Sequence, residues 1–118
     1  MAFLLIFRAD QRAFVESEAF DKLGSIGVRD LLRNSMPGAA IAGHFHCGDD
    51  AVLIELKSDL QTFAVSDSSP AGFEFAVRLQ ARFNEPLRIV DEAYSFDLEL
   101  KSFNNADQLQ DMIRSVGI

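Results

Sequence analysis

Two histidines one residue apart form the only group in this sequence with the spacing of metal ligands. His44 and His46 are the only histidines, and residues two apart on a strand project from the same face. If the following segment folds back as a hairpin, Glu55 lies diagonal to His44, and a His-His-carboxylate set could hold zinc or iron with open positions. No second cluster completes a four-ligand site, so we expect no bound metal and keep these three residues as candidate ligands.

The sequence lacks the usual motifs of nucleophilic catalysis. Ser25 lies in Gly24-Ser25-Ile26-Gly27, which is typical of a helix stop and does not match the Gly-x-Ser-x-Gly elbow. Cys47 follows His46, but adjacent strand residues point to opposite faces, so the thiol and the imidazole should not meet. The sequence also contains no Walker loop and no dinucleotide-binding fingerprint. We therefore expect a protein that is not an enzyme and carries no cofactor.

The histidines fall in residues 39–57, where two alternating runs flank the turn-prone pair Gly48-Asp49. Pairing Cys47 with Asp50 places the apolar side chains on one face of the hairpin, whereas a shift of one residue would mix the two faces. The expected dry face carries Ile41, Phe45, Val52, Ile54 and Leu56. The expected wet face carries Ala42, His44, His46, Leu53, Glu55 and Lys57.

The first third of the chain predicts one strand and one helix. The apolar run at residues 2–7 is typical of a strand buried on both faces, near the middle of a sheet. Asp10 offers an N-cap for a helix whose apolar stripe ends at Gly24. Residues 28–33 predict a short helical turn, which Pro37 would stop.

The rest of the chain predicts two longer helices separated by strands. Residues 60–65 predict a strand, and Ser69 followed by Pro70 predicts a helix that runs to about residue 84. Residues 87–100 return to strand, with an acidic wet face. Asn105 and Gln108 resemble a capping box for a closing helix that ends at Gly117.

This order of elements predicts a single α+β domain over residues 1–118. We expect a mostly antiparallel sheet with the helices packed on one face, because each strand then buries its dry side. The nearest simple topology is βαββαβ with an additional C-terminal helix. The wet sides of the strands would stay open to solvent or to a partner.

Composition restricts the class of protein. The chain has 118 residues, 48% of them hydrophobic, with 18 acids against 11 bases, a net charge of −7 and one cysteine. This length supports one core without disulfides or a structural metal, and the negative charge disfavours nucleic acid as a partner. A single cysteine fits a reducing compartment, and we find no signal peptide or membrane-spanning segment. We therefore expect a cytoplasmic protein with no membrane partner.

The net charge is concentrated in two segments. Residues 49–67 carry five acids and one lysine, and residues 85–99 carry five acids and one arginine. We expect these acids on the face that the helices leave open, where they would attract a basic protein. The same acids also fit a role in solubility and in discouraging edge pairing. Tyr94, the only tyrosine, is a candidate anchor because a phenol supplies apolar area and a hydrogen bond. The candidate partner-binding residues are Glu55, Asp91, Glu92, Tyr94, Asp97 and Glu99.

In its small size, strand-borne acidity and lack of catalytic motifs, the chain resembles the bacterial immunity proteins that neutralise a cognate toxin by binding it. These families share no common fold, so the resemblance concerns function alone. It implies an inhibitor that sets acidic groups against a basic site on the toxin and blocks access of the substrate. The acidic groups it implies include Glu55, Asp91, Asp97 and Glu99.

Two alternatives stay open. One is a metal-binding or small-ligand-binding domain, enzymatic or not, centred on His44, His46 and Glu55. The other is a homo-oligomeric structural subunit, for example a homodimer. Because stacking two acidic sheet faces would cost like-charge repulsion, a contact through a sheet edge or a helix is expected to be easier.

Overall fold

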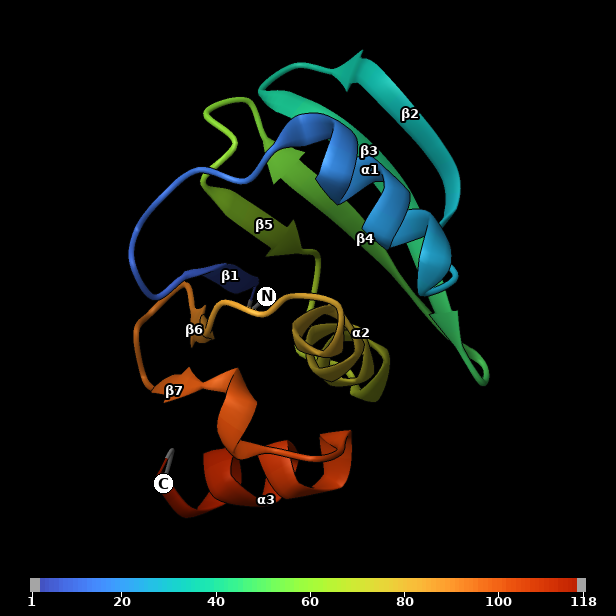
Figure 1. The fold of residues 1–118 in the computed structure, drawn as a ribbon. Coiled ribbons are helices and arrows are strands. Elements are labelled where there is room, and N and C mark those ends of the chain that lie inside the picture. The colour runs from blue at the N-terminus through green and yellow to red at the C-terminus, as the bar shows by residue number, and fades with distance from the viewer. Residues whose placement is uncertain (1–2, 117–118) are drawn as a thin grey trace.

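The computed structural model describes residues 3–116, and within them an antiparallel sheet carries three helices (Figure 1). The strands are β1 (Leu4–Arg8), β2 (Arg29–Met36), β3 (Ala39–Cys47), β4 (Asp50–Lys57), β5 (Thr62–Val65), β6 (Leu87–Asp91) and β7 (Asp97–Glu99). The helices are α1 (Glu16–Ser25), α2 (Pro70–Ala81) and α3 (Ala106–Val116), with a 3-10 turn, η1, at Leu100–Ser102. The strand order is β2-β3-β4-β5-β1-β6-β7. The α+β class with a closing helix is therefore confirmed, with more strands than the simple βαββαβ pattern.

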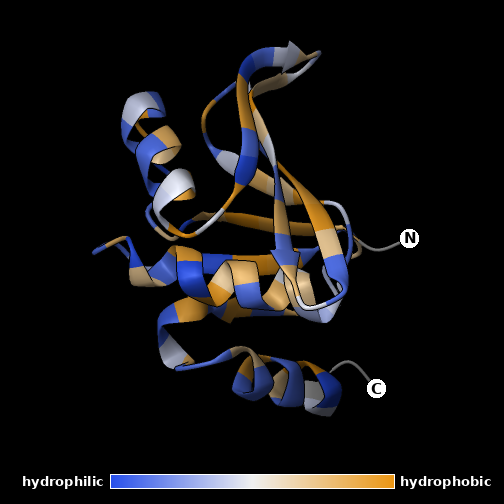
Figure 2. Ribbon diagram, turned by 90° about the vertical axis from the view of Figure 1, so that its right-hand side faces the viewer, coloured by the Kyte–Doolittle hydropathy of each residue, from blue (hydrophilic) through white to orange (hydrophobic). Residues whose placement is uncertain are grey.

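The helices α1 and α2 pack on one face of the sheet, with phenylalanine rings filling the space between, and α3 packs against α2. Phe14 lies edge-on to Phe63 at 4.8 Å and to Phe83 at 5.3 Å. Phe75 of α2 lies edge-on to Phe63 at 6.4 Å and to Phe45 at 5.7 Å. In Figure 2, α2 is largely hydrophobic in colour whereas α3 is mixed, which matches the deeper position of α2. No helix in residues 3–116 has the length and apolar character needed to cross a membrane.

The hairpin of β3 and β4 has the predicted register. Cys47 lies opposite Asp50, and each pair up to Ile41 opposite Leu56 is the one expected from the alternation. The five residues of the expected dry face are buried, while His44 and His46 are exposed on the other side. Gly48 occupies the turn with a φ of 60°, a conformation that glycine adopts without steric cost.

Residues 28–33, predicted as a helical turn, instead lead into and begin the edge strand β2. The reason is tertiary: Gly43 on β3 has no side chain, and a Cβ there would lie 2.7 Å from Val28 Cγ1 and 2.9 Å from the Arg29 carbonyl. This close approach lets β2 pair with β3, and strand pairing overrides the local helical pattern. Asp30 and Asn34 have positive φ angles of 57° and 54° where the register shifts, as expected of a bulged edge strand.

The predicted cap of α1 is wrong, because the helix begins at Glu16. Asp10 accepts hydrogen bonds from the Arg8 guanidinium at 2.7 Å and from the Arg12 backbone N–H at 3.0 Å, so it organises the turn after β1 instead. Gln11 follows with a positive φ of 61°, and the Phe14 N–H donates to the Leu60 carbonyl at 2.7 Å before the helix starts.

The starts of α2 and α3 are as predicted. The Ser69 hydroxyl accepts from the Gly72 N–H at 3.4 Å, and Pro70 is the first helical residue. Asn105 accepts from the Gln108 N–H at 2.9 Å, although the Gln108 side chain accepts from the Asn104 N–H. The helix α2 ends at Ala81, earlier than expected, and the predicted stop of α3 at Gly117 lies outside the described residues.

Candidate functional site

The face of the sheet that the helices leave uncovered, here called the open face, contains two neighbouring rows of residues that cross the strands. The strand pairings place the first row in the order Asp97, Val90, Leu5, Ala64, Glu55 and Ala42. The second row runs Glu99, Arg88, Phe7 and Thr62, and Lys57 lies beyond it on β4. Both rows therefore have apolar side chains on β1 and charged side chains towards β4 and β7.

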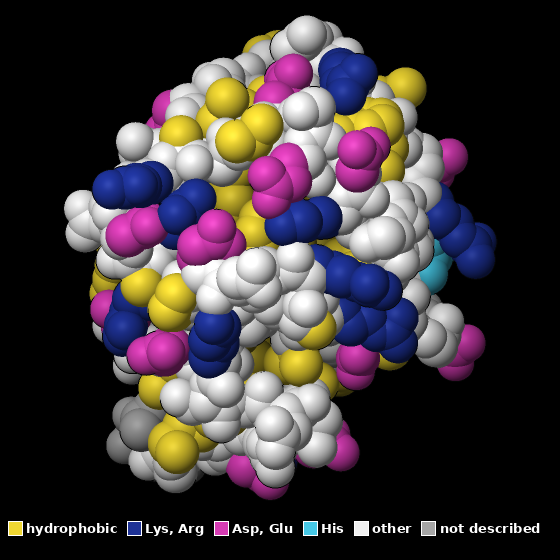
Figure 3. Space-filling view, in the orientation of Figure 1, with side chains coloured by type: hydrophobic (Ala, Val, Ile, Leu, Met, Phe, Trp, Pro, Cys, Tyr) yellow, Lys and Arg dark blue, Asp and Glu magenta, His cyan; other side chains and the backbone are white. Residues whose placement is uncertain are grey.

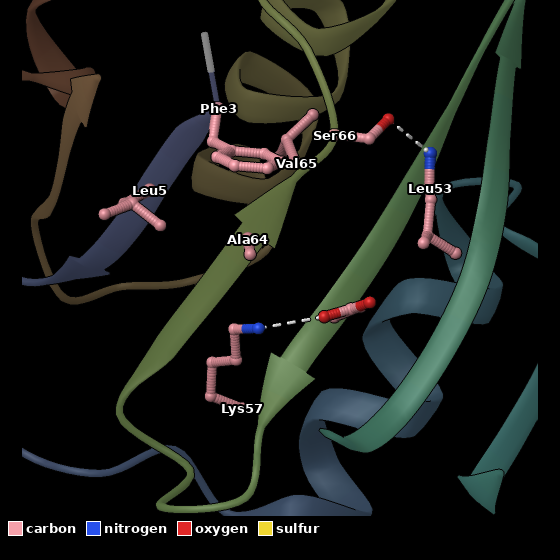
Figure 4. Close-up of a pocket in the computed structure, with 8 residues that line it drawn as sticks. Phe3, Leu5, Leu53, Lys57, Ala64, Val65 and Ser66 are labelled. Atoms are coloured by element: carbon pink, nitrogen blue, oxygen red, sulfur yellow. Dashed lines mark hydrogen bonds and ion pairs between the residues drawn. The ribbon is translucent and has the colours of Figure 1, made fainter. Parts of the chain in front are cut away.

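An apolar hollow of about 320 Å³, here called the groove, lies on the open face where β5 ends (Figure 4). Beyond Val65 the strand pairing is replaced by two hydrogen bonds, from the Leu53 N–H to the Ser66 hydroxyl at 3.0 Å and from the Ser66 N–H to the Leu53 carbonyl at 3.1 Å. This early end of β5 leaves Leu53 and Phe3 uncovered, and Phe3 is 45% exposed. The groove is lined by Phe3, Leu5, Leu53, Glu55, Lys57, Ala64, Val65 and Ser66.

Glu55 belongs to this groove and is already paired. Its side chain is 16% exposed, and Lys57 Nζ lies 3.0 Å from Glu55 Oε2 (Figure 4). The strand order puts β4 four strand spacings from β7, roughly 19 Å at 4.8 Å per spacing. The structure therefore does not bring Glu55 to the other candidate acids.

The other five candidates lie together at the hairpin of β6 and β7. The Asp91 carboxylate accepts from the Ser95 N–H at 2.7 Å and from the Ser95 hydroxyl, and the Tyr94 N–H donates to the Asp91 carbonyl at 3.1 Å. These bonds close a turn in which Tyr94 has a φ of 53° and a side chain that is 67% exposed. Asp91 is thus a turn-forming residue, and the turn holds the tyrosine ring out in solvent.

A second hollow of about 540 Å³ lies between this turn and the open face. Arg88 crosses it, donating from Nε to Asp97 Oδ1 at 2.7 Å and from Nη2 to the Asp97 carbonyl at 3.3 Å. The Asp97 side chain remains 50% exposed. In the described part of the chain, Glu92 and Glu99 are exposed and take part in no ion pair. The hollow is lined by Phe7, Ala9, Gln11, Gln61, Thr62, Arg88, Tyr94 and Asp97.

The acids of residues 49–67 do not gather on the open face as expected. Asp49 and Asp59 are exposed in turns, and Asp67 accepts from the Ser69 N–H at 3.0 Å before α2. Figure 3 shows acidic and basic side chains intermixed over the visible side of the molecule. The helices carry acids as well, for example Glu74 of α2, whose carboxylate lies 2.8 Å from the Arg78 guanidinium. Within residues 3–116, only the hairpin of β6 and β7 combines several exposed acids with an exposed aromatic ring.

The two histidines project from the open face of β3 but do not meet Glu55 as metal ligands. His44 Nδ1 lies 3.8 Å from Asp30 Oδ2 on β2, whereas Glu55 is turned to Lys57. Among residues 3–116, no three His, Cys, Asp or Glu side chains form a group that could hold a metal ion. Cys47 is half-buried and packs against the core on the helix side, away from His46.

The groove was not predicted from the sequence, although its signal was present. Leu5 and Phe7 alternate with the fully buried Leu4 and Ile6, and the whole run indicated a strand covered on both sides. In the structure nothing among the described residues covers the second side completely, and Leu5 and Phe7 are only half-buried.

Comparison with protein-family models, with curated proteins and with solved structures gave no match to this chain.

Proposed function

We propose that the chain is a non-catalytic protein-binding module that binds a basic protein through the hairpin of β6 and β7. The observation that carries this proposal is the Tyr94 turn: an exposed aromatic ring, held by Asp91 in a left-handed conformation, beside Asp97. The contact residues in this proposal are Glu92, Tyr94, Asp97 and Glu99, and Asp91 positions Tyr94.

The left-handed backbone conformation of Tyr94 costs free energy, and burial of its side chain does not compensate for that cost. A residue with a side chain pays roughly 1–2 kcal/mol in the left-handed region, and a ring that is 67% exposed buries little apolar area in exchange. Tyrosine is also enriched among the residues that dominate protein interfaces. A binding role accounts for a strained and exposed tyrosine better than a role in the core.

The negative charge of the hairpin indicates that its partner is basic. Residues 88–99 carry four acids and one arginine, and Arg88 is engaged with Asp97. Opposite charges attract over a Debye length of roughly 8–10 Å at physiological salt and accelerate association. The resemblance to immunity proteins supports a more specific proposal, in which the partner is a bacterial toxin whose basic active site the hairpin covers.

The test is capture of a partner by an immobilised chain at low and at high salt. We compare the wild type with a variant that combines Tyr94→Ala, Asp97→Asn and Glu99→Gln, three changes on the proposed surface. The matched control combines Asp107→Asn and Asp111→Asn, which remove two exposed acids from α3. We expect the wild type and the control to capture the same basic protein at low salt, and the triple variant to lose it by at least tenfold. No specific capture, or equal capture by the triple variant, would contradict the proposal.

A further inference from the structure

We propose that the open face binds the open face of a second copy of this chain, forming a two-fold symmetric dimer around β1 and the groove. This inference goes beyond the proposed function and does not depend on it, but the two surfaces share Asp97 and Glu99, so a second copy and a basic partner would compete for the β7 end. It rests on the order of residues in the two rows of the open face, which are apolar at β1 and charged towards β4 and β7.

The first argument is the apolar centre of the open face. A sheet with one face in water normally places polar residues at every second position, whereas β1 carries Leu5 and Phe7 there. Phe3, Leu53 and Ala64 extend this surface into the groove. Contiguous exposed apolar surface on a soluble protein marks an interaction site, and covering it is worth roughly 25 cal/mol per Å².

The second argument is charge complementarity at the β4 end of the face. A two-fold axis that runs across the strands, between the two rows, exchanges the first row with the second. It places Glu55 against Lys57 of the second copy, and Leu5 against Phe7 of the second copy. Such an isologous contact uses the same patch on both copies, as most soluble dimers do. The Glu55–Lys57 pair can then exchange partners without leaving a charge unpaired.

The repulsion expected from the sequence is weaker than the charge count suggests. Of the three acids on the open face, Glu55 is paired with Lys57 and Asp97 with Arg88. Glu99 lies at the β7 end of its row, next to Arg88, where an interface is wet and screened by salt. The same two-fold axis places Asp97 against Glu99 of the second copy, so like charges oppose each other at the β7 end, in addition to the net charge of −7 on each copy.

The size of the chain also permits a stable contact. A standard interface buries roughly 800 Å² per partner, which is about one eighth of the 6314 Å² that the structure exposes. The two rows span from β7 to β4, roughly 19 Å across the strands. Two sheets in face-to-face contact lie about 10 Å apart, so half-buried side chains such as Leu5 and Phe7 can interdigitate.

The first experiment measures the dimer dissociation constant by sedimentation equilibrium. We expect reversible dimerisation of the wild type in the micromolar to submillimolar range. Leu5→Lys places a charge in the centre of the proposed contact and should weaken dimerisation at least tenfold. Met112→Lys is the matched control, because Met112 is 42% exposed on α3, outside the two rows. A monomeric wild type at submillimolar concentration, or equal weakening by both variants, would overturn the proposal.

A second experiment reverses the charges of Lys57 and Glu55, and it tests the dimer even if Leu5→Lys fails to fold. Lys57→Glu sets like charges against each other across the two-fold axis and should weaken the dimer several-fold. Adding Glu55→Lys to the same chain restores opposite charges and should restore dimerisation. Circular dichroism checks that each variant is folded. If the double variant dimerises no better than Lys57→Glu alone, the two-fold arrangement is wrong.

Discussion

Two segments with the same charge turn out to be different kinds of surface. Residues 49–67 and residues 85–99 each carry five acids and one base. In the first segment, Glu55 is paired with Lys57 inside an apolar groove and the remaining acids lie outside it. In the second segment, exposed acids flank an exposed tyrosine in a closed turn. Charge counted along a chain therefore does not say which surface it forms, because strand register and pairing decide that.

The difference matters because the two surfaces should respond to salt in opposite ways. An apolar contact between two copies with the same net charge is opposed by long-range repulsion, which salt screens. A contact between exposed acids and a basic partner is favoured by long-range attraction, which salt also screens.

The largest expected effect comes from detaching β6 from α2. The buried Gln80 side chain accepts from the Leu87 N–H at 2.7 Å and donates to the Phe83 and Glu85 carbonyls at 3.3 and 3.0 Å. Gln80→Ala leaves these backbone groups without partners, so we expect the free energy of unfolding to fall by about 3 kcal/mol in denaturant titrations. Gln110→Ala on α3 is the control and should change it by less than about 0.5 kcal/mol. Equal effects of the two changes would show that Gln80 does not anchor the second region.

The next effect separates stability from binding at Tyr94. Tyr94→Gly relieves the left-handed strain, so we expect thermal unfolding to show a gain of up to about 1 kcal/mol. The same change should weaken capture of a basic partner. A loss of stability above about 1 kcal/mol would mean that the ring serves the fold and not an interface.

A smaller effect compares the ion pairs of the two regions. Glu55→Gln removes a charge whose side chain is 16% exposed, whereas Asp97→Asn removes one that is 50% exposed. We expect a loss of about 1 kcal/mol for the first and below about 0.5 kcal/mol for the second, measured by urea unfolding, because solvent screens the exposed pair. The reverse order would contradict the assignment of Glu55 to a half-dry groove.

The smallest effect is a pH dependence outside both regions. Hydrogen bonds from the Arg8 guanidinium lower the pKa of Asp10. The stabilisation from this pair is therefore present above the unfolded-state pKa of the carboxyl group and is lost as the pH falls through the folded-state pKa. We expect an NMR titration to place the Asp10 pKa below that of an unperturbed aspartate, and Asp10→Asn to remove this part of the acid dependence. An unshifted titration would refute the pairing.

The fold was predictable where local signals agree with tertiary packing. Strict alternation around Gly48 fixes the register of β3 and β4, and the caps at Ser69 and Asn105 mark the starts of α2 and α3. β2 was not predictable, since its pairing depends on the missing side chain of Gly43 on the next strand, β3, and the local pattern of residues 28–33 does not contain this signal. The start of α1 was missed because Asp10 bonds to Arg8 instead of capping a helix.

The candidate site was predictable in composition and not in geometry. Tyr94 and its neighbouring acids could be named from residue type, but the left-handed turn that exposes the ring depends on the Asp91 side chain. Neither the pairing of Glu55 with Lys57 nor the groove follows from the pattern of one strand, since the groove lies where β5 stops pairing with the longer β4.

The salt dependence of self-association tests the contrast between the two regions most directly. Sedimentation equilibrium of the wild-type chain at low and at high sodium chloride measures it without any partner. If the open face is an apolar contact between like-charged copies, the dimer should tighten several-fold as salt rises. A chain that stays monomeric throughout, or a dimer that weakens with salt, would contradict an apolar contact between two open faces.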